Sequence, residues 1–214
     1  MKQDNKASFK SAIIDFSGAF ALTDSDFEKL TEIIRQVSAA FENNFFVIVP
    51  NLKFRGLPLT THIQDLTDKL SLLLIDELIW LALTKTESDA VYSSLFKSIL
   101  WFSKNPVYQF NKDLLRVEHI WKDFEWGKRK ANYHELGKDP GNIWVKEYSE
   151  KAVITKHDFF SAEEIFTKLL ISQASAAADR FLLYTSEKDF SVENIKQEIE
   201  RKTGYQPIVE LKEI

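Results

Sequence analysis

The sequence predicts an α/β protein of the Rossmann-like type, with a mostly parallel sheet. Short apolar runs alternate along the chain with segments in which apolar residues recur every three or four positions, as strands alternating with helices do. One of these runs, residues 45–50, is almost continuously apolar, which is typical of a central strand that is buried on both faces. The 214 residues suffice for one domain, residues 1–214, with a sizeable core.

The first half of the chain begins with a predicted strand at residues 12–16. Apolar residues at helical spacing then predict a helix over residues 23–43. Three residues that favour helix N-termini stand at its start: Thr23, Asp24 and Asp26. The buried strand at 45–50 follows, and residues 57–74 are predicted to form a second helix.

Two aromatic and β-branched runs come next, at residues 76–85 and 94–104. Only a short polar segment separates them, so we expect neighbouring strands. Trp80 and Trp101 lie within these runs and are expected to be core aromatics.

The last third of the chain repeats the alternation of helix and strand. A helix is predicted over residues 161–175 with Ser161 as its N-cap, followed by a strand at 179–186. Then come a helix over residues 191–205 and a strand over 206–214. Two residues mark the ends of the helix that starts at 191: Ser191 as N-cap and Gly204 as C-cap.

Residues 105–151 differ in character from the rest of the chain. They hold glycines, prolines, three tryptophans and many charges of both signs, so they form a loop-rich excursion from the predicted sheet. The tryptophans, Trp121, Trp126 and Trp144, either form a small satellite core or contact a partner or a base.

Composition excludes several classes of function. The chain has no cysteine, so disulfides, thiolate zinc sites and a cysteine nucleophile are excluded. The formal net charge of −4 argues against a stand-alone nucleic-acid binder, although a local basic patch remains compatible with it. The polar start and the charges Asp76 and Glu77 within the longest apolar run predict a cytoplasmic protein without membrane spans.

Common nucleotide motifs are missing. No G-x-G occurs anywhere, so neither a dinucleotide fingerprint nor a P-loop is present. The four histidines are scattered without the spacing of a metal helix, and no metal site is predicted. Ser17 lacks the flanking glycines of a nucleophile elbow.

Three segments resemble, in order, the second half of a β-group DNA amino-methyltransferase. They are "DELIWLALTK", "SLFKSILWFSKNPVYQFN" and "ELGKDPGNIW", of which the "GKDPGNIW" loop is the most specific. Enzymes of this family transfer a methyl group from S-adenosylmethionine to the exocyclic amine of adenine or cytosine. The resemblance implies a Rossmann-like methyltransferase fold, in which residues 105–151 correspond to the target-recognition region.

The stretch "IIDFSGAF" occupies the place of the family's catalytic D-P-P-Y motif. Asp15 keeps the acid, but Phe16 and Ser17 replace the prolines and Gly18 replaces the aromatic residue. Phe20 is the remaining candidate for stacking on a base. Asp15 is therefore either a relic or atypical catalytic acid, or a strand-end acid that caps the next loop.

The segments that would hold the cofactor depart from the family in the same way. Residues 183–185 stand where the family has D-P-F, and no glycine follows them. Glu210 keeps the acid that binds the cofactor ribose, or is simply a solvated charge. The resemblance thus implies no cofactor, or S-adenosylmethionine if the chain is active.

Basic and aromatic residues interleave in "WGKRKANYHELGKDPGN". In the target-recognition region such residues would contact phosphates and bases. The candidate nucleic-acid contacts are Lys128, Arg129, Lys130, Tyr133, His134, Lys138 and Asn142. A solvated basic turn, partly neutralised by Glu125, Glu135 and Asp139, is the alternative.

Three functional hypotheses follow. The first is an inactive methyltransferase-like subunit that pairs with an active methyltransferase, as a heterodimer or homodimer, and helps to bind DNA or RNA. The second is an active enzyme with an atypical site in which Asp15 accepts the proton, Phe20 stacks and Glu210 holds the cofactor. The third is a protein-protein scaffold unrelated to methylation.

Overall fold

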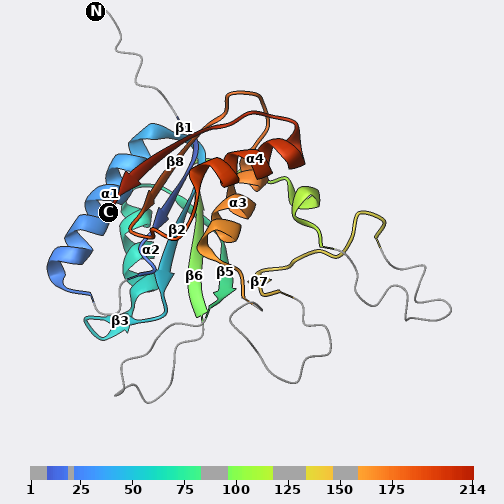
Figure 1. Cartoon of the computed structure of the whole chain (residues 1–214). Coiled ribbons are helices and arrows are strands. Elements are labelled where there is room, and N and C mark those ends of the chain that lie inside the picture. The colour runs from blue at the N-terminus through green and yellow to red at the C-terminus, as the bar shows by residue number, and fades with distance from the viewer. Residues whose placement is uncertain (1–8, 19–21, 83–95, 118–133, 147–158) are drawn as a thin grey trace, which may run out of the picture.

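A computed structural model of the chain describes residues 9–18, 22–82, 96–117, 134–146 and 159–214 (Figure 1). Strands and helices alternate as the sequence predicts. The strands are β1 (Phe9–Asp15), β2 (Phe41–Pro50), β3 (Lys53–Phe54), β4 (Leu57–Pro58), β5 (Leu73–Leu81), β6 (Phe96–Ser103), β7 (Ile143–Trp144), β8 (Arg180–Thr185) and β9 (Ile208–Glu213). The helices are α1 (Asp24–Ala40), α2 (Leu59–Lys69), the 3₁₀ helix η1 (Lys112–Leu115), α3 (Ala162–Gln173) and α4 (Val192–Thr203).

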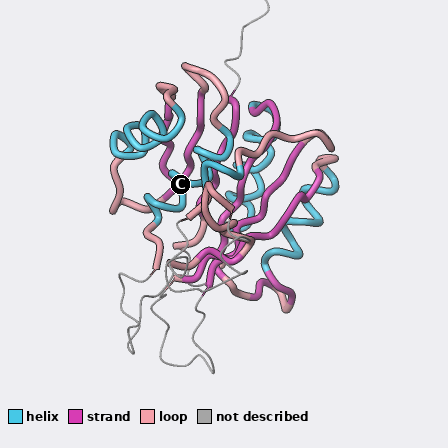
Figure 2. The backbone as a smooth tube through the Cα atoms, turned by 90° about the vertical axis from the view of Figure 1, so that its right-hand side faces the viewer, coloured by secondary structure: helices cyan, strands magenta, loops and turns pink. Residues whose placement is uncertain are grey.

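Seven of the described strands form one sheet, in the order β7-β5-β6-β2-β1-β8-β9. Four of its six pairings are parallel, and only β6 runs against both of its neighbours. The prediction of a mostly parallel sheet is therefore confirmed, as is the adjacency of β5 and β6. Helices cover both faces, with α1 and α2 on one side and α3 and α4 on the other (Figures 1 and 2).

The centre of the sheet is buried on both faces, as the apolar run of β2 predicts. Phe45 packs in the core under α1 and α2, while its neighbour Phe46 packs in the core under α3 and α4. Ile14 and Ile13 of β1 divide between the same two cores. Because successive residues of a strand point to opposite faces, the core to which a residue belongs identifies its face.

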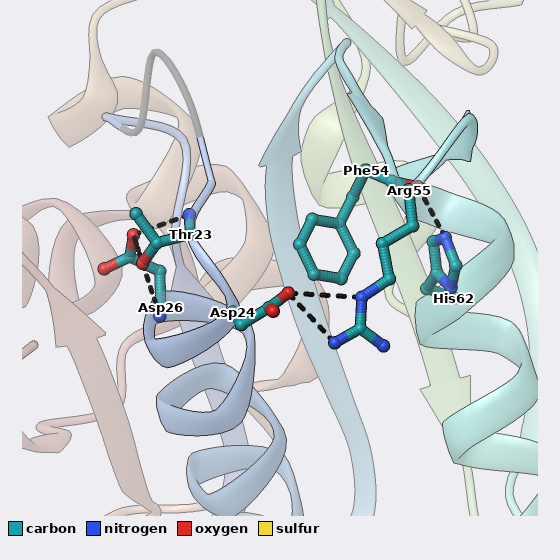
Figure 3. A network of polar contacts seen from close by, with 6 residues as sticks. All are labelled: Thr23, Asp24, Asp26, Phe54, Arg55 and His62. Carbon is teal, nitrogen blue, oxygen red and sulfur yellow. Dashed lines mark hydrogen bonds and ion pairs between the residues drawn. The ribbon is translucent and has the colours of Figure 1, made fainter.

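Sequence-predicted caps begin three of the described helices, α1, α3 and α4. Thr23 and Asp26 form a reciprocal capping box at the start of α1, with the Asp26 amide 3.2 Å from Thr23 Oγ1 (Figure 3). Ser161 and Glu164 do the same for α3. Hydrogen bonds from Thr23 lower the pKa of the Asp26 carboxyl, since they favour its charged form.

The second helix is shorter than the predicted span of residues 57–74. It begins at Leu59, after the small β3–β4 hairpin, and ends at Lys69. Ser71 takes a left-handed conformation (φ 56°) that turns the chain into β5. The hairpin is joined to neighbouring helices by an Asp24–Arg55 ion pair and a 2.7 Å contact between His62 and the Phe54 carbonyl (Figure 3).

The excursion at 105–151 contains regular structure in its described parts. Strand β7 adds to the sheet beside β5, and Trp144 lies in the main core under α3 and α4, rather than in a satellite core. Trp80 and Trp101 are buried in the same core, as expected, whereas Trp121 and Trp126 lie outside the described residues.

The "YQFN" turn of this excursion closes the end of α3. Asn111 donates a 2.5 Å hydrogen bond from Nδ2 to the Ala174 carbonyl, and its amide bonds the Ser172 carbonyl. Phe110 packs on Trp101 with ring centroids 4.6 Å apart. The turn thus satisfies carbonyls that the helix end leaves without partners.

No helix within the described ranges has the length and apolar character that crossing a membrane requires.

Candidate functional site

The candidate site lies at the carboxyl edge of the sheet, between β1 and β8. These strands are parallel neighbours. After β1 the chain continues to β2 on one side of the pair, and after β8 it continues to β9 on the other side. Open α/β sheets bind ligands at such a switch point. Asp15 and Thr185 end the two strands, are paired in register and are almost completely buried.

Both carboxylate oxygens of Asp15 accept hydrogen bonds from groups of its own chain. Oδ1 accepts a hydrogen bond from the Ser17 amide (3.1 Å) and Oδ2 accepts one from the Thr185 hydroxyl (2.9 Å). Thr185 Oγ1 in turn accepts a hydrogen bond from the Glu187 amide (2.9 Å). One carboxylate therefore organises the loops that follow both strands, as a local capping acid does.

Lys97 completes the cluster from the antiparallel strand β6. Because β6 runs against its neighbours, its first residues lie at the carboxyl edge of the others, and Lys97 pairs with Pro50 and Trp80. Its Nζ donates a 3.0 Å hydrogen bond to Ser17 Oγ and lies 4.2 Å from the centre of the Trp80 ring. Both contacts stabilise an ammonium group.

Burial lowers the pKa of Lys97, although the carboxylates of Asp15 and Glu187 partly offset this effect. Sequence reasoning missed this residue. The available signal was the one charged residue in the otherwise uncharged run of residues 96–103.

We expect the titration of Lys97 to make the free energy of unfolding depend on pH in the alkaline range. Its folded pKa lies below the unfolded value of 10.5, so between the two values the unfolded chain binds more protons. The free energy of unfolding contributed by Lys97 therefore rises with pH through this window, up to pH 10.5. Lys97→Met removes this contribution, so the wild type should gain stability relative to the variant as pH rises.

Urea unfolding from neutral pH to pH 10.5 measures this difference. Lys29→Met, which removes an exposed lysine, is the control and should show no such trend. A difference between Lys97→Met and wild type that stays constant with pH would contradict the prediction.

The turns after β1 and β8 face each other across the switch point. A methyl group added at Gly18 would lie in ordinary contact, 3.4 Å, with Ser186 Oγ, so the two turns lie close to each other. Ser186, Glu187 and Lys188 follow β8 in place of glycines. Within the described residues, the turn after β8 therefore lacks the glycine backbone that such sites use for a close approach to a ligand.

Glu210 does not join this cluster. It lies in the middle of β9 opposite Leu182, on the face covered by α1, and forms an ion pair with Arg180. Asp15 lies on the other face. The acid in register with the ends of β1 and β8 is Glu213, which is exposed and 3.7 Å from Lys188.

The predicted nucleic-acid contacts are only partly described. His134, Lys138 and Asn142 are exposed on the described part of the excursion. The Asn142 carbonyl accepts a 2.7 Å hydrogen bond from the Ile79 amide, and Lys138 pairs with Val117 in an isolated antiparallel bridge. The remaining candidates lie outside the described residues: Phe20, Lys128, Arg129, Lys130 and Tyr133.

Within the described ranges, no three histidine, aspartate or glutamate side chains gather closely enough to hold a metal ion.

Comparisons with known proteins identify the fold. No protein-family model and no curated protein matches the sequence. Among solved structures, the PvuII DNA methyltransferase (cytosine-N4-specific) is similar with a TM-score of 0.60 and 10% identity, over 97% of this chain and 76% of that one. M1.HpyAVI is similar with a TM-score of 0.50 and 12% identity, over 98% of this chain and 83% of that one.

The chain therefore has the Rossmann-like fold of DNA methyltransferases. This result agrees with the resemblance carried by the "GKDPGNIW" loop and with the order of the neighbouring segments.

Proposed function

We propose that this chain is a catalytically inactive DNA methyltransferase-like subunit that pairs with an active DNA or RNA amino-methyltransferase and helps to bind nucleic acid. The observation that carries the proposal is the state of Asp15, whose two oxygens both accept hydrogen bonds from the chain's own groups. An acid that accepts protons from a substrate amine needs an oxygen aimed at that amine. Here the oxygens hold two loops instead.

The cofactor side supports the same conclusion. The turns after β1 and β8 come close together, no glycine follows β8, and Glu210 lies on the opposite face of the sheet from Asp15. The chain thus keeps the fold without a site suited to S-adenosylmethionine. Loss of catalysis with retention of the fold is what a supporting subunit requires.

Exposed apolar side chains near the amino end of β5 favour a protein partner. Leu73 and Leu74 begin that strand, and Leu73 pairs with Ser103 at the end of β6. Val107 and Tyr108 follow Ser103 closely in sequence, and Val107 is 85% exposed. Neighbouring exposed apolar residues of this kind mark interaction surfaces.

Titration of S-adenosylmethionine into the purified, folded chain tests the loss of the cofactor site. A working enzyme would bind at about micromolar strength, or about −8 kcal/mol, and give clear heat in a calorimeter. We expect no binding heat. Binding at this strength would overturn the proposed inactivity and favour the active enzyme with an atypical site.

Reconstitution with a methyltransferase from the same source tests the pairing. We expect a stable 1:1 complex that methylates nucleic acid faster than the active chain alone. Equal activity with and without this chain would contradict the pairing. Co-purification only with proteins unrelated to methylation would favour a scaffold instead.

A further inference from the structure

A hollow that is lined by no residue of the Asp15 cluster lies where the loop-rich excursion meets α3. It has a volume of about 290 Å³, near the lower end of the range for small-molecule sites. It is bounded by residues of η1, β7 and α3 and of the segments next to them. The lining residues are Leu115, Val117, Lys138, Pro140, Ile143, Trp144, Val145, Lys146, Phe160 and Lys168.

Two aromatic rings form part of the wall. Trp144 is held in place because its Nε1 donates a 3.1 Å hydrogen bond to the Gly141 carbonyl. Phe160 carries two cations against its ring, with Lys168 Nζ 4.8 Å and Lys146 Nζ 5.7 Å from the ring centre. Aliphatic side chains complete an apolar interior that suits a flat ring.

The charge around this interior is positive. Three of the ten described lining residues are lysines and none is acidic. Glu164, whose charge acts on Lys168, is already committed to Lys146 at 2.9 Å and to the cap of α3. Burial raises the pKa of Glu164, but hydrogen bonds from Ser161 and Lys146 outweigh this effect and lower it.

Lys168 is the cation best placed to receive an anion. Its pKa is lowered, first by burial and also by the positive charges of Lys202 and Lys146, while Glu164 and Glu198 act in the opposite direction. A half-buried ammonium group, whose charged form burial disfavours, is stabilised by a bound anion.

We propose that this pocket binds one nucleotide, with its base in the apolar interior beside Phe160 and the small exposed part of Trp144, and its phosphate at Lys168 and Lys146. The inference rests on the nucleic-acid part of the proposed function and assigns it a site distinct from Asp15. The nucleotide comes either from a single strand or from the free pool. The pocket is too small for more than one base, so a strand would place a single unstacked nucleotide there.

The test measures the affinity of the full chain for 5′-AMP, for a short single-stranded DNA, and for the same DNA with abasic residues. Tryptophan fluorescence reports binding, and Trp144→Phe should remove most of the change. Lys168→Met should weaken binding by roughly tenfold, since it removes one charge-assisted contact. Lys29→Met, on the exposed face of α1, should bind as the wild type does.

Each result decides a point. Binding of AMP and DNA that falls in Lys168→Met supports the pocket for both sources, and binding of DNA alone restricts it to a strand. Equal affinity for the abasic strand overturns the base-binding role. DNA binding unchanged in Lys168→Met overturns the pocket but leaves the proposed nucleic-acid function intact. No binding to any probe overturns both, while pairing is decided separately by reconstitution. Circular dichroism confirms that each variant is folded.

Discussion

Asp15→Ala should lower the free energy of unfolding by about 2–4 kcal/mol, because it leaves buried donors without acceptors. The Ser17 amide and the Thr185 hydroxyl both donate to this carboxylate. Lys97 also loses a nearby opposite charge. For a domain of this length the loss corresponds to a fall in Tm of about 4–16 °C.

Asp15→Asn removes the negative charge of the acid but keeps one oxygen that can accept a hydrogen bond. The amide oxygen can still accept a bond from the Ser17 amide, so the loss should be about 1 kcal/mol. The Nδ2 group, however, faces Thr185 Oγ1 and cannot accept the bond that this hydroxyl donates to the carboxylate. Asp65→Ala, at an exposed position of α2, is the control and should change stability by less than about 0.5 kcal/mol.

A gain in stability on Asp15→Ala would be equally informative. Groups retained for chemistry are often held at a cost to stability, so their removal stabilises the fold. A higher Tm for Asp15→Ala would therefore mark Asp15 as a functional acid. That result would favour the hypothesis of an active enzyme over the proposed silent subunit.

The elements that the sequence predicted correctly are those in which the pattern of apolar residues matches the faces that are buried. Strand β2 is apolar along its whole length and lies between two helix layers, so pattern and environment agree. Helices α3 and α4 carry their caps at Ser161 and Ser191 as predicted. The predicted end of α2 was wrong because the apolar spacing of the helix continues into Leu73 and Leu74, which belong to β5.

The site was harder to predict, because it depends on register across the sheet. Lys97 reaches Ser17 only because β6 is antiparallel and places its first residues at the carboxyl edge. Glu210 and Glu213 are both acids of one strand, and only the pairing with β8 shows that Glu213 shares the row of Asp15. A one-residue change of register moves a side chain to the other face.

Gly137→Ala should break the contact that holds the loop-rich excursion over the pocket. Gly137 has a φ of 106°, which side chains rarely adopt, and an added Cβ would lie 2.4 Å from the Val117 carbonyl oxygen. Because that oxygen belongs to the backbone, it cannot turn aside. The carbonyl is also the acceptor for the Lys138 amide at 2.7 Å.

Hydrogen exchange at the amides of Val117 and Lys138 measures the effect, because these two amides form the bridge between the segments. Backbone strain of this kind costs about 1–3 kcal/mol, and the clash adds to it, so exchange should be faster by roughly 30-fold or more. Amides of β1 should keep their protection, since that strand lies in the centre of the sheet.

Gly141→Ala is the matched control in the same loop. Gly141 also has a positive φ (64°), but no atom lies within 4 Å of an added Cβ. The substitution Gly141→Ala therefore lowers the stability only through the left-handed conformation that the alanine must adopt, by about 1–2 kcal/mol. Val117 and Lys138 line the proposed pocket, so Gly137→Ala should also weaken AMP binding while Gly141→Ala preserves it. Equal exchange and equal AMP affinity in the two variants would mean that the bridge does not shape the pocket, since only Gly137 touches it.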